Sequence, residues 1–138
     1  MAKIKCKGTA LKQVLAGTAY TTVAQVISLT LPTMESETYE SDTLDNALAG
    51  IPYDSTGRTE GGTLSGELFY DPALAGHKAL LTLLTTPGDE SWKLVFADTG
   101  VSEWIFTGAG FSFGGTVALN DGLKGSFSIK LDGLPTFP

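Results

Sequence analysis

The chain has 138 residues, a hydrophobic share of 42%, 17 glycines and a formal net charge of −6. This length suits a single domain over residues 1–138 with one hydrophobic core. The acidic balance disfavours a reader of nucleic acid, which needs a basic face, although it allows a protein that encloses DNA while repelling it. A lone cysteine, Cys6, excludes an internal disulfide framework. No apolar run approaches the roughly 18 residues that span a bilayer, so we expect no membrane anchor.

The N-terminal third has the period-two alternation of apolar and polar residues that predicts β-strands. The pattern predicts one strand over residues 9–15 and a longer strand over residues 22–31. Ala16, Gly17 and Thr18 lie between them, which indicates a first hairpin.

Residues 34–62 follow neither the strand nor the helix period, and they carry seven carboxylates against the single Arg58. A stretch of this length without a pattern is usually functional or disordered in a small domain. We expect an arm that projects from the body, with a solvated loop as the alternative. Several large apolar side chains punctuate the arm: Tyr39, Leu44, Leu48, Ile51 and Tyr53.

A strand is predicted over residues 64–70 and a helix over residues 71–86. Asp71 is a good N-cap and Pro72 fits the first helical position. His77, Leu80 and Leu84 fall on one stripe, so the helix is expected to lie across a sheet. Pro87 and Gly88 then end it.

The C-terminal third is again rich in strands, predicted over residues 92–96, 101–107, 111–119 and 123–131. Leu123, Phe127 and Ile129 share an apolar face, while Lys124 and Ser126 share the polar face. Asn120, Asp121 and Gly122 form a strong hairpin signal between the last two strands. The chain is therefore predicted to be mainly β, with one helix.

A search for catalytic or ligand-binding patterns argues against an enzyme. His77 is the single candidate base and lies on or beside the core stripe of the predicted helix. The stretch 62–66 misses a nucleophile elbow by one position, and Gly108 and Gly110 open no phosphate-binding loop. Metal-ligand clusters are absent from the sequence, so no metal, cofactor or catalytic residue is expected.

One tripeptide, Asp98-Thr99-Gly100, resembles the active-site triplet of dimeric aspartic proteases. Two such carboxylates sharing a proton could activate water. The same residues also suit a tight turn between two strands, and this second interpretation is favoured. A small aspartic protease and a monomeric β-sandwich binding module remain as alternative functions.

Association between copies of the chain is the function that the remaining features favour. Strand edges that nothing covers tend to pair with other strands, and the apolar residues of the arm have no obvious place in a core. We therefore expect Tyr39, Leu44, Leu48, Ile51 and Tyr53 to contact a neighbouring copy, together with Asp42 and Asp45. Lys3, Lys5 and Lys7 alternate along one strand face and are possible charge partners of this arm. Contacts between unlike surfaces of this kind produce rings or tubes.

Several segments, in their order and spacing, resemble the tail tube proteins (major tail proteins) of long-tailed, non-contractile bacteriophages. They are Gly8-Thr9-Ala10-Leu11, the acidic stretch that ends in Asp42-Thr43-Leu44-Asp45, the run from Gly62 to Pro72, then His77, Leu80 and Trp92, and a final strand through Gly122, Leu123, Ser126 and Phe127.

The resemblance implies two packed antiparallel β-sheets, as a sandwich or barrel-like fold, with a flanking helix and a long extended loop. It also implies a virion protein, made in the host bacterial cytoplasm, whose hexameric rings stack into the tail tube. Double-stranded DNA would pass through the tube without sequence-specific binding, and an acidic lining would help it to slide. The partners implied are the tail tip or baseplate, the tape-measure protein and the terminator protein. A secretion-system tube subunit or a tail terminator is the related alternative.

Overall fold

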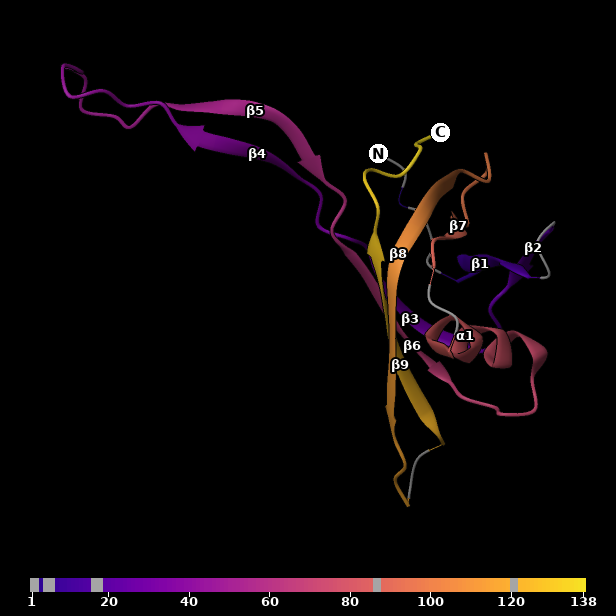
Figure 1. Ribbon diagram of the computed structural model, residues 1–138. Helices are drawn as coiled ribbons and strands as arrows, with labels where there is room; N and C mark the ends of the chain where they lie inside the picture. The colour runs from indigo at the N-terminus through magenta and orange to yellow at the C-terminus, as the bar shows by residue number, and fades with distance from the viewer. Residues whose placement is uncertain (1–2, 4–6, 16–18, 86–87, 120–121) are drawn as a thin grey trace.

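An antiparallel seven-stranded sheet forms the body of the protein in the computed structural model, and a two-stranded hairpin projects from it (Figure 1). The structure describes residues 3, 7–15, 19–85, 88–119 and 122–138. The strand order in the body is β2-β1-β7-β8-β9-β6-β3. Every neighbouring pair is antiparallel.

The first predicted hairpin is confirmed, because β1 (Ala10–Leu15) pairs with β2 (Ala19–Thr22). Its predicted turn at residues 16–18 lies outside the described residues. The following strand, β3 (Val26–Thr30), is shorter than the strand predicted over residues 22–31. Gln25 has a φ of 63°, which no strand residue adopts, so the extended chain is broken immediately before Val26.

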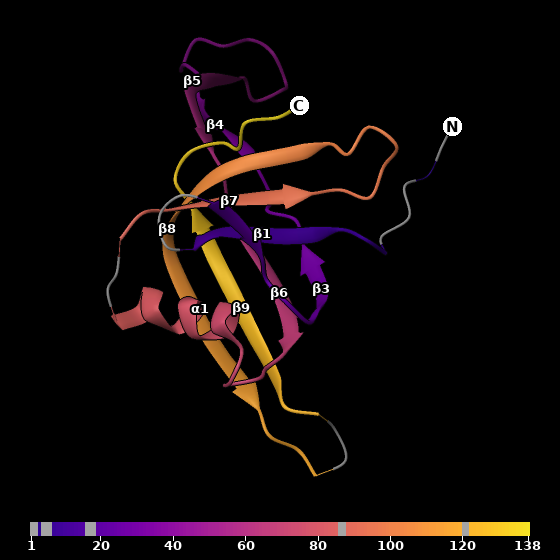
Figure 2. The same cartoon turned by 90° about the vertical axis from the view of Figure 1, so that its right-hand side faces the viewer.

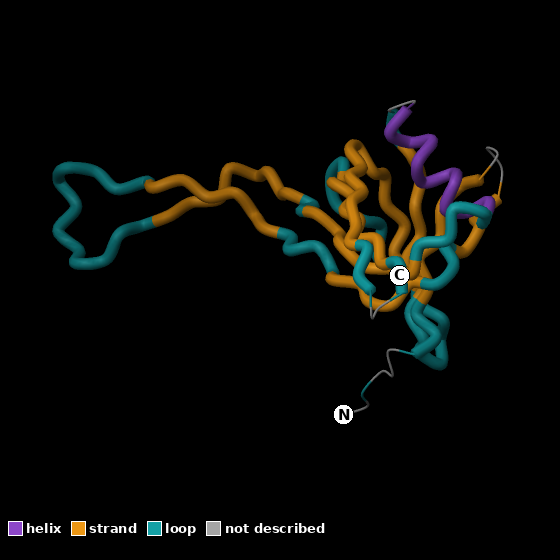
Figure 3. The backbone as a smooth tube through the Cα atoms, turned by 90° about the horizontal axis from the view of Figure 1, so that it is seen from below, coloured by secondary structure: helices purple, strands orange, loops and turns teal. Residues whose placement is uncertain are grey.

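Residues 34–62 hold two strands, β4 (Glu35–Glu40) and β5 (Tyr53–Glu60), which pair with each other and with no strand of the body. Every residue of both strands is exposed, which explains why no apolar alternation marks them in the sequence. The hairpin extends far from the sheet and is called the arm below (Figures 1 and 3).

The chain returns to the body through β6 (Thr63–Phe69) and then forms α1 (Ala75–Thr85). The helix begins later than the predicted residue 71, because Asp71 caps a separate turn. Its Oδ1 accepts a hydrogen bond from the Ala73 N–H at 2.9 Å, and its carbonyl accepts one from Leu74. No helix in the described part of the chain has the length and apolar character needed to cross a membrane.

The last three strands are β7 (Glu90–Val95), β8 (Glu103–Thr116) and β9 (Lys124–Leu131). The two strands predicted at 101–107 and 111–119 are one strand of 14 residues. Its first half pairs with β7 and its second half pairs with β9, with a register shift at Gly108 and Gly110. This bulge bends β8, so that the sheet folds back over itself (Figure 2).

The hydrophobic core lies between the two halves of the curled sheet and under α1. Its largest fully buried side chains are Trp92, Leu11, Leu64, Leu68, Leu80, Leu94, Ile129 and His77. Burying one such leucine contributes roughly 1.5–3 kcal/mol. The prediction of a mainly β fold with one helix is confirmed, although the two expected layers are halves of one continuous sheet.

Candidate assembly surfaces

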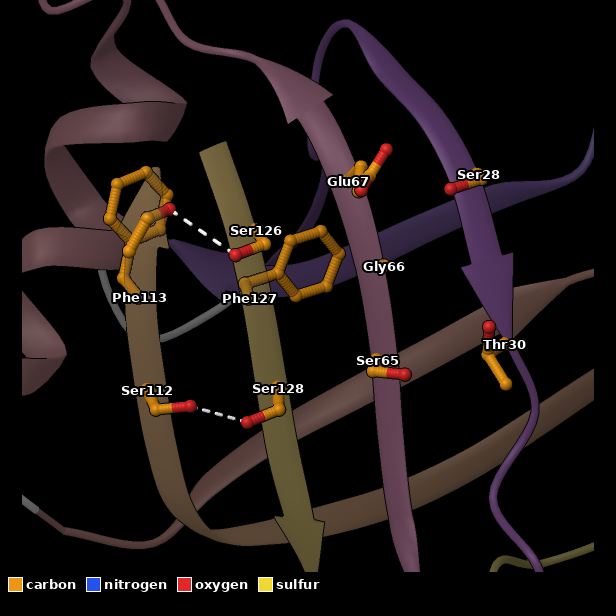
Figure 4. A pocket seen from close by; sticks show the side chains of 11 residues that line it. Ser28, Thr30, Ser65, Gly66, Glu67, Ser112, Phe113, Ser126, Phe127 and Ser128 are labelled. Carbon is orange, nitrogen blue, oxygen red and sulfur yellow. Dashed lines mark hydrogen bonds between the residues drawn. The ribbon is translucent and has the colours of Figure 1, made fainter. Parts of the chain in front are cut away.

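The outer face of β3, β6, β9 and the second half of β8 is lined by small hydroxyl side chains (Figure 4). One row crosses all four strands in register, from Ser112 to Ser128, Ser65 and Thr30. The next row contains Gly114, Ser126, Glu67 and Ser28. This surface, called the hydroxyl face below, forms a shallow hollow of ≈ 630 Å³.

The hydroxyl face exists because these strands alternate strictly between the two sides of the sheet. In β9, Phe127 and Ile129 are buried in the core, while Ser126 and Lys130 are exposed on the other side. The hydroxyls of Ser112 and Ser128 hydrogen-bond to each other across β8 and β9. Charge on this face of the four strand segments is limited to Glu67, Lys124 and Lys130.

Two edges of this four-stranded region have no strand partner among the described residues. One is β3, the terminal strand of the sheet order. The other is the second half of β8, from Gly110 to Thr116, since β7 pairs only with residues up to Gly108. The two edges lie on opposite sides of the molecule (Figure 2). Unpaired N–H and C=O groups along such edges are templates for pairing with another chain.

The arm is held together by its own ladder and by a hydrogen-bonded tip. Tyr39 pairs with Asp54 and Glu40 with Tyr53, and the ladder ends there. At the tip, Asp42 Oδ1 accepts hydrogen bonds from the Thr43 N–H at 3.0 Å and from Asn46 Nδ2 at 2.6 Å. Because these bonds are local, the tip needs no contact with the body to keep its shape.

A second carboxylate in the tip, Asp45, accepts a hydrogen bond from the Thr43 hydroxyl at 2.6 Å. This bond lowers the pKa of Asp45, with a smaller effect in the same direction from the residue's own backbone N–H. Both bonds favour the charged form, so the tip carries its negative charge at neutral pH.

All the apolar side chains of the arm singled out in the sequence are exposed. Leu44 at the tip is fully exposed, and Leu48 is 78% exposed. The remaining three are Tyr39, Ile51 and Tyr53, each more than half exposed. Nothing in the described chain covers this apolar surface, so the arm could bury it only against another molecule.

The N-terminal lysines are not joined to the arm by an ion pair within the described residues. Lys3 and Lys7 are exposed, and Lys5 lies outside the described residues. Lys7 precedes β1 and lines a groove between β1 and β3. Pairing of these lysines with arm carboxylates therefore remains a prediction about neighbouring copies.

The one histidine has a packing role. His77 is 2% exposed, and its Nε2 donates a hydrogen bond to the Ala24 carbonyl at 2.8 Å. Its Nδ1 accepts one from the Asp71 N–H at 3.0 Å, which fixes the proton on Nε2. The ring also contacts Tyr70 edge-on. His77 thus joins the helix through Nε2 to the chain before β3 and through Nδ1 to the chain between β6 and α1.

Asp98, the residue of the protease-like triplet, closes a turn between β7 and β8. Its Oδ1 accepts a hydrogen bond from the Ser102 N–H at 2.7 Å, and its Oδ2 accepts one from the Ser102 hydroxyl at 2.6 Å. The Ser102 hydroxyl, followed by the Ser102 N–H, lowers the pKa of Asp98. Both oxygens are held by the turn, as the turn interpretation predicts.

Reasoning from the sequence missed the hydroxyl face and the open edge of β8. The alternation in the last strand predicts one polar face, but it does not show that this face continues through Ser65, Ser112 and Thr30 on other strands. That continuation depends on register, which the sequence does not specify. The recurrence of serine or threonine at alternate positions in several predicted strands was the available signal.

Among the described residues, no three carboxylate, histidine or cysteine side chains form a metal-binding cluster.

Open strand edges and a projecting arm with exposed apolar side chains are features that suit a subunit of an assembly. The family model described as "Lambda phage tail tube protein, TTP" matches residues 4–138, and the chain belongs to this family. The chain is accordingly a structural component of a phage virion and not an enzyme. A comparison with curated proteins finds no match.

Solved structures of assembled tails share the fold. A chain from the tail of an empty gene transfer agent particle, refined with C6 symmetry, is 14% identical, with a TM-score of 0.77 over 97% of this chain and 98% of that chain. A chain of the SPP1 tail tube is 12% identical, with a TM-score of 0.68 over 99% and 80%. A chain of the anti-feeding prophage baseplate is 10% identical, with a TM-score of 0.68 over 96% and 94%.

Proposed function

We propose that this chain assembles into hexameric rings that stack to form the phage tail tube, through which DNA is delivered. The observation that carries the proposal is the pair of open edges, β3 and the second half of β8, at opposite sides of one four-stranded region. An edge on each side allows every copy to pair with two neighbours through unlike surfaces. Such heterologous contacts close into a ring.

Strand direction supports this ring. Each strand of the series β8, β9, β6 and β3 is antiparallel to the next, so β3 runs opposite to β8. The β8 of a neighbouring copy in the same orientation would therefore continue the antiparallel pattern beside β3. With the six-fold symmetry of the gene transfer agent tail, four strands from each of six copies would close a 24-stranded barrel.

The hydroxyl face would then line the inside of the barrel, since α1 and the core occupy the other side of the sheet (Figure 1). The hollow of ≈ 630 Å³ indicates that this face is concave. Its central rows carry Glu67 as their single charged residue. We therefore infer that DNA slides past a lining dominated by small hydroxyl groups, with Lys124 and Lys130 toward its two ends, in place of the acidic lining expected from the sequence.

The arm would join one ring to the next. It projects from the end of the body near the C-terminus, whereas the part of the hairpin where β8 ends and β9 begins lies at the opposite end (Figure 1). Both elements expose apolar side chains: Leu44 and Leu48 on the arm, and Val117 and Leu119 on the hairpin. Stacked rings would bury these surfaces. The rings at the two ends of the tube would bind the tail tip or baseplate at one end and the terminator protein at the other. The tape-measure protein would occupy the lumen until DNA enters it.

Electron microscopy of the purified protein over a range of concentrations tests the proposal. Six-fold rings and tubes are expected, and a monodisperse monomer at high concentration would overturn it. Cysteines at Ser112 and Thr30, or at Ser112 and Ser28, would check the edge pairing, since the two partners would become neighbours across the ring contact. In a Cys6→Ser background, cross-linked products should form when tubes are treated and should not form when the protein is dissociated to monomers before treatment.

A further inference from the structure

A groove of ≈ 750 Å³ separates β3 from the ends of β1 and β7, and it is called the seam groove here. It marks the place where the curled sheet fails to close on itself. Its apolar lining is partly open to solvent, since Ile27 is 45% exposed and Leu31 is 46% exposed. The groove is lined by Lys7, Gly8, Thr9, Val26, Ile27, Ser28, Leu29, Leu31, Leu94 and Phe96.

The last turn of α1 presents apolar side chains on the opposite side of the molecule. Leu84 is 43% exposed, and with Leu83 it borders a small hollow of ≈ 200 Å³ along the edge of β8, beside Gly110 and Phe111. In Figure 2, α1 crosses in front of β9 and β8, and its last turn extends past the β8 edge, on the side away from β3. The seam groove is lined by residues of β3 itself. The helix end therefore overhangs one open edge and the groove adjoins the other.

The charges at these two places are complementary. The last turn of α1 contains no basic residue, so nothing on the helix itself compensates the partial negative charge of its C-terminal carbonyls. Glu90 lies in the same hollow and adds a carboxylate. Lys7 lines the seam groove and supplies a cation. Two apolar surfaces with opposite charge at their margins suit a contact between unlike sides of two copies.

We propose that the last turn of α1 of one copy docks into the seam groove of the next copy in the ring, with Leu84 entering between the β3 and β1–β7 walls. This inference rests on the ring of the proposed function, because pairing of β8 with a neighbour's β3 would carry the helix end over that neighbour's groove. The occupant is a second copy of this chain. Lys7 faces the C-terminal end of the helix and Glu90, and the contact hides Ile27 and Leu31 from water.

A pair of matched variants tests the role of Leu84. Leu84→Asp places a carboxylate in the docking surface, and Thr82→Asp places the same charge two residues away, on another side of the helix. Thr82 is exposed, so its variant is the control for charge and helix propensity. The concentration at which tubes appear should rise at least about tenfold for Leu84→Asp, the equivalent of one buried leucine, and stay near wild type for Thr82→Asp. Equal effects of the two variants would contradict the docking.

Cross-linking identifies the occupant directly. In a Cys6→Ser background, Leu84→Cys is combined with Ile27→Cys or with Leu31→Cys, and tubes are treated with a short bismaleimide. The combination of Leu48→Cys with Leu31→Cys serves as the comparison, since it reports an arm lying in the groove. All these positions are exposed in the single chain, so the substitutions should not prevent folding.

The expected product is a ladder of cross-linked chains that ends at six, because the contact repeats within one ring. Three results would overturn the docking: tubes that give no product through position 84, tubes that are cross-linked through position 48 instead, and a ladder longer than six chains. None of these results would contradict the proposed assembly into tubes. Absence of tubes from the unmodified protein would overturn both this contact and the proposed function.

Discussion

Gly108 lies so close to Trp92 that a Cβ added at Gly108 would stand 2.8 Å from the indole Nε1 and 2.7 Å from Cγ2 of Ile129. Gly108 also lies at the register shift in β8, where this strand passes from β7 to β9. Trp92 and Ile129 are fully buried and cannot move aside. The bend that folds the sheet over its core therefore requires a residue without a side chain at this position.

Gly108→Ala should consequently destabilise the fold by about 1–3 kcal/mol, the usual cost of forcing extra volume into a packed core. Gly114→Ala is the control in the same strand, because a Cβ at Gly114 meets nothing within 4 Å. That variant should be neutral or slightly stabilising. Urea unfolding of both variants measures the difference, and equal midpoints would contradict the packing argument.

The sequence predicts much of this fold because the strands of the body are amphipathic. Leu123, Phe127 and Ile129 alternate with polar residues, and the last hairpin follows from that pattern. The join between the two halves of β8 could not be predicted, since Gly108 and Gly110 also suit a turn between strands. Their role depends on the position of Trp92, which belongs to a different strand.

The two strands of the arm and the hydroxyl face could not be predicted from the sequence, for two different reasons. Every residue of both arm strands is exposed. Because neither face of these strands is buried, their sequences lack the alternation of apolar and polar residues that predicts a strand. The apolar residues of the arm nevertheless stand out in the sequence as unsuited to a core, and the structure leaves them exposed. The hydroxyl face arises from register between strands far apart in the chain, and local pattern carries no information about register.

His77 joins α1 to the body, and its replacement should be costly. His77→Ala leaves the Ala24 carbonyl and the Asp71 N–H without their partners and opens a cavity in the core. We expect a loss of about 2–4 kcal/mol in the free energy of unfolding. Lys78→Ala, at the next and exposed position of the helix, should change it by less than about 0.5 kcal/mol. Thermal unfolding of the two variants provides the comparison.

The turn held by Asp98 should make stability depend on pH in acid. Because its pKa is lowered in the folded state, the Asp98 carboxylate stabilises the fold above the ordinary aspartate pKa of about 3.9. This contribution is lost as the pH falls through the lowered value. Asp98→Asn should therefore be less stable than wild type at pH 7 in urea unfolding, and the gap should narrow toward pH 3.

Ser102→Ala removes the hydroxyl that contributes most to this shift, so it should reduce the same pH dependence. Tube formation at neutral pH should survive Asp98→Asn, since the residue closes a turn and touches no open edge. A peptidase activity with an acid optimum that Asp98→Asn abolished would restore the protease interpretation.

Removal of the arm tip separates ring formation from stacking. Glu40 and Tyr53 face each other at the end of the arm ladder, so residues 41–52 can be replaced by Asn-Gly, a two-residue hairpin turn. The variant should unfold at the wild-type denaturant concentration, because the tip packs against nothing in the body. It should form rings that do not elongate, as seen by electron microscopy. Tubes of normal length would refute the stacking role of the tip.

An added positive charge in the middle of the hydroxyl face should strengthen the retention of DNA by the lining, because Glu67 is the single charged residue of the central rows. Ser128→Arg would place an arginine in the central hydroxyl row of every copy, where each ring repeats it around the lumen. Preformed tubes of this variant should retain short DNA duplexes at low salt and release them as salt rises, since phosphate contacts weaken as counterions accumulate. Thr82→Arg adds the same charge on α1, on the other side of the sheet (Figure 1). If the hydroxyl face lines the lumen, duplexes enclosed by Thr82→Arg tubes should elute at lower salt than those in Ser128→Arg tubes, and equal retention by both variants would place the lumen elsewhere.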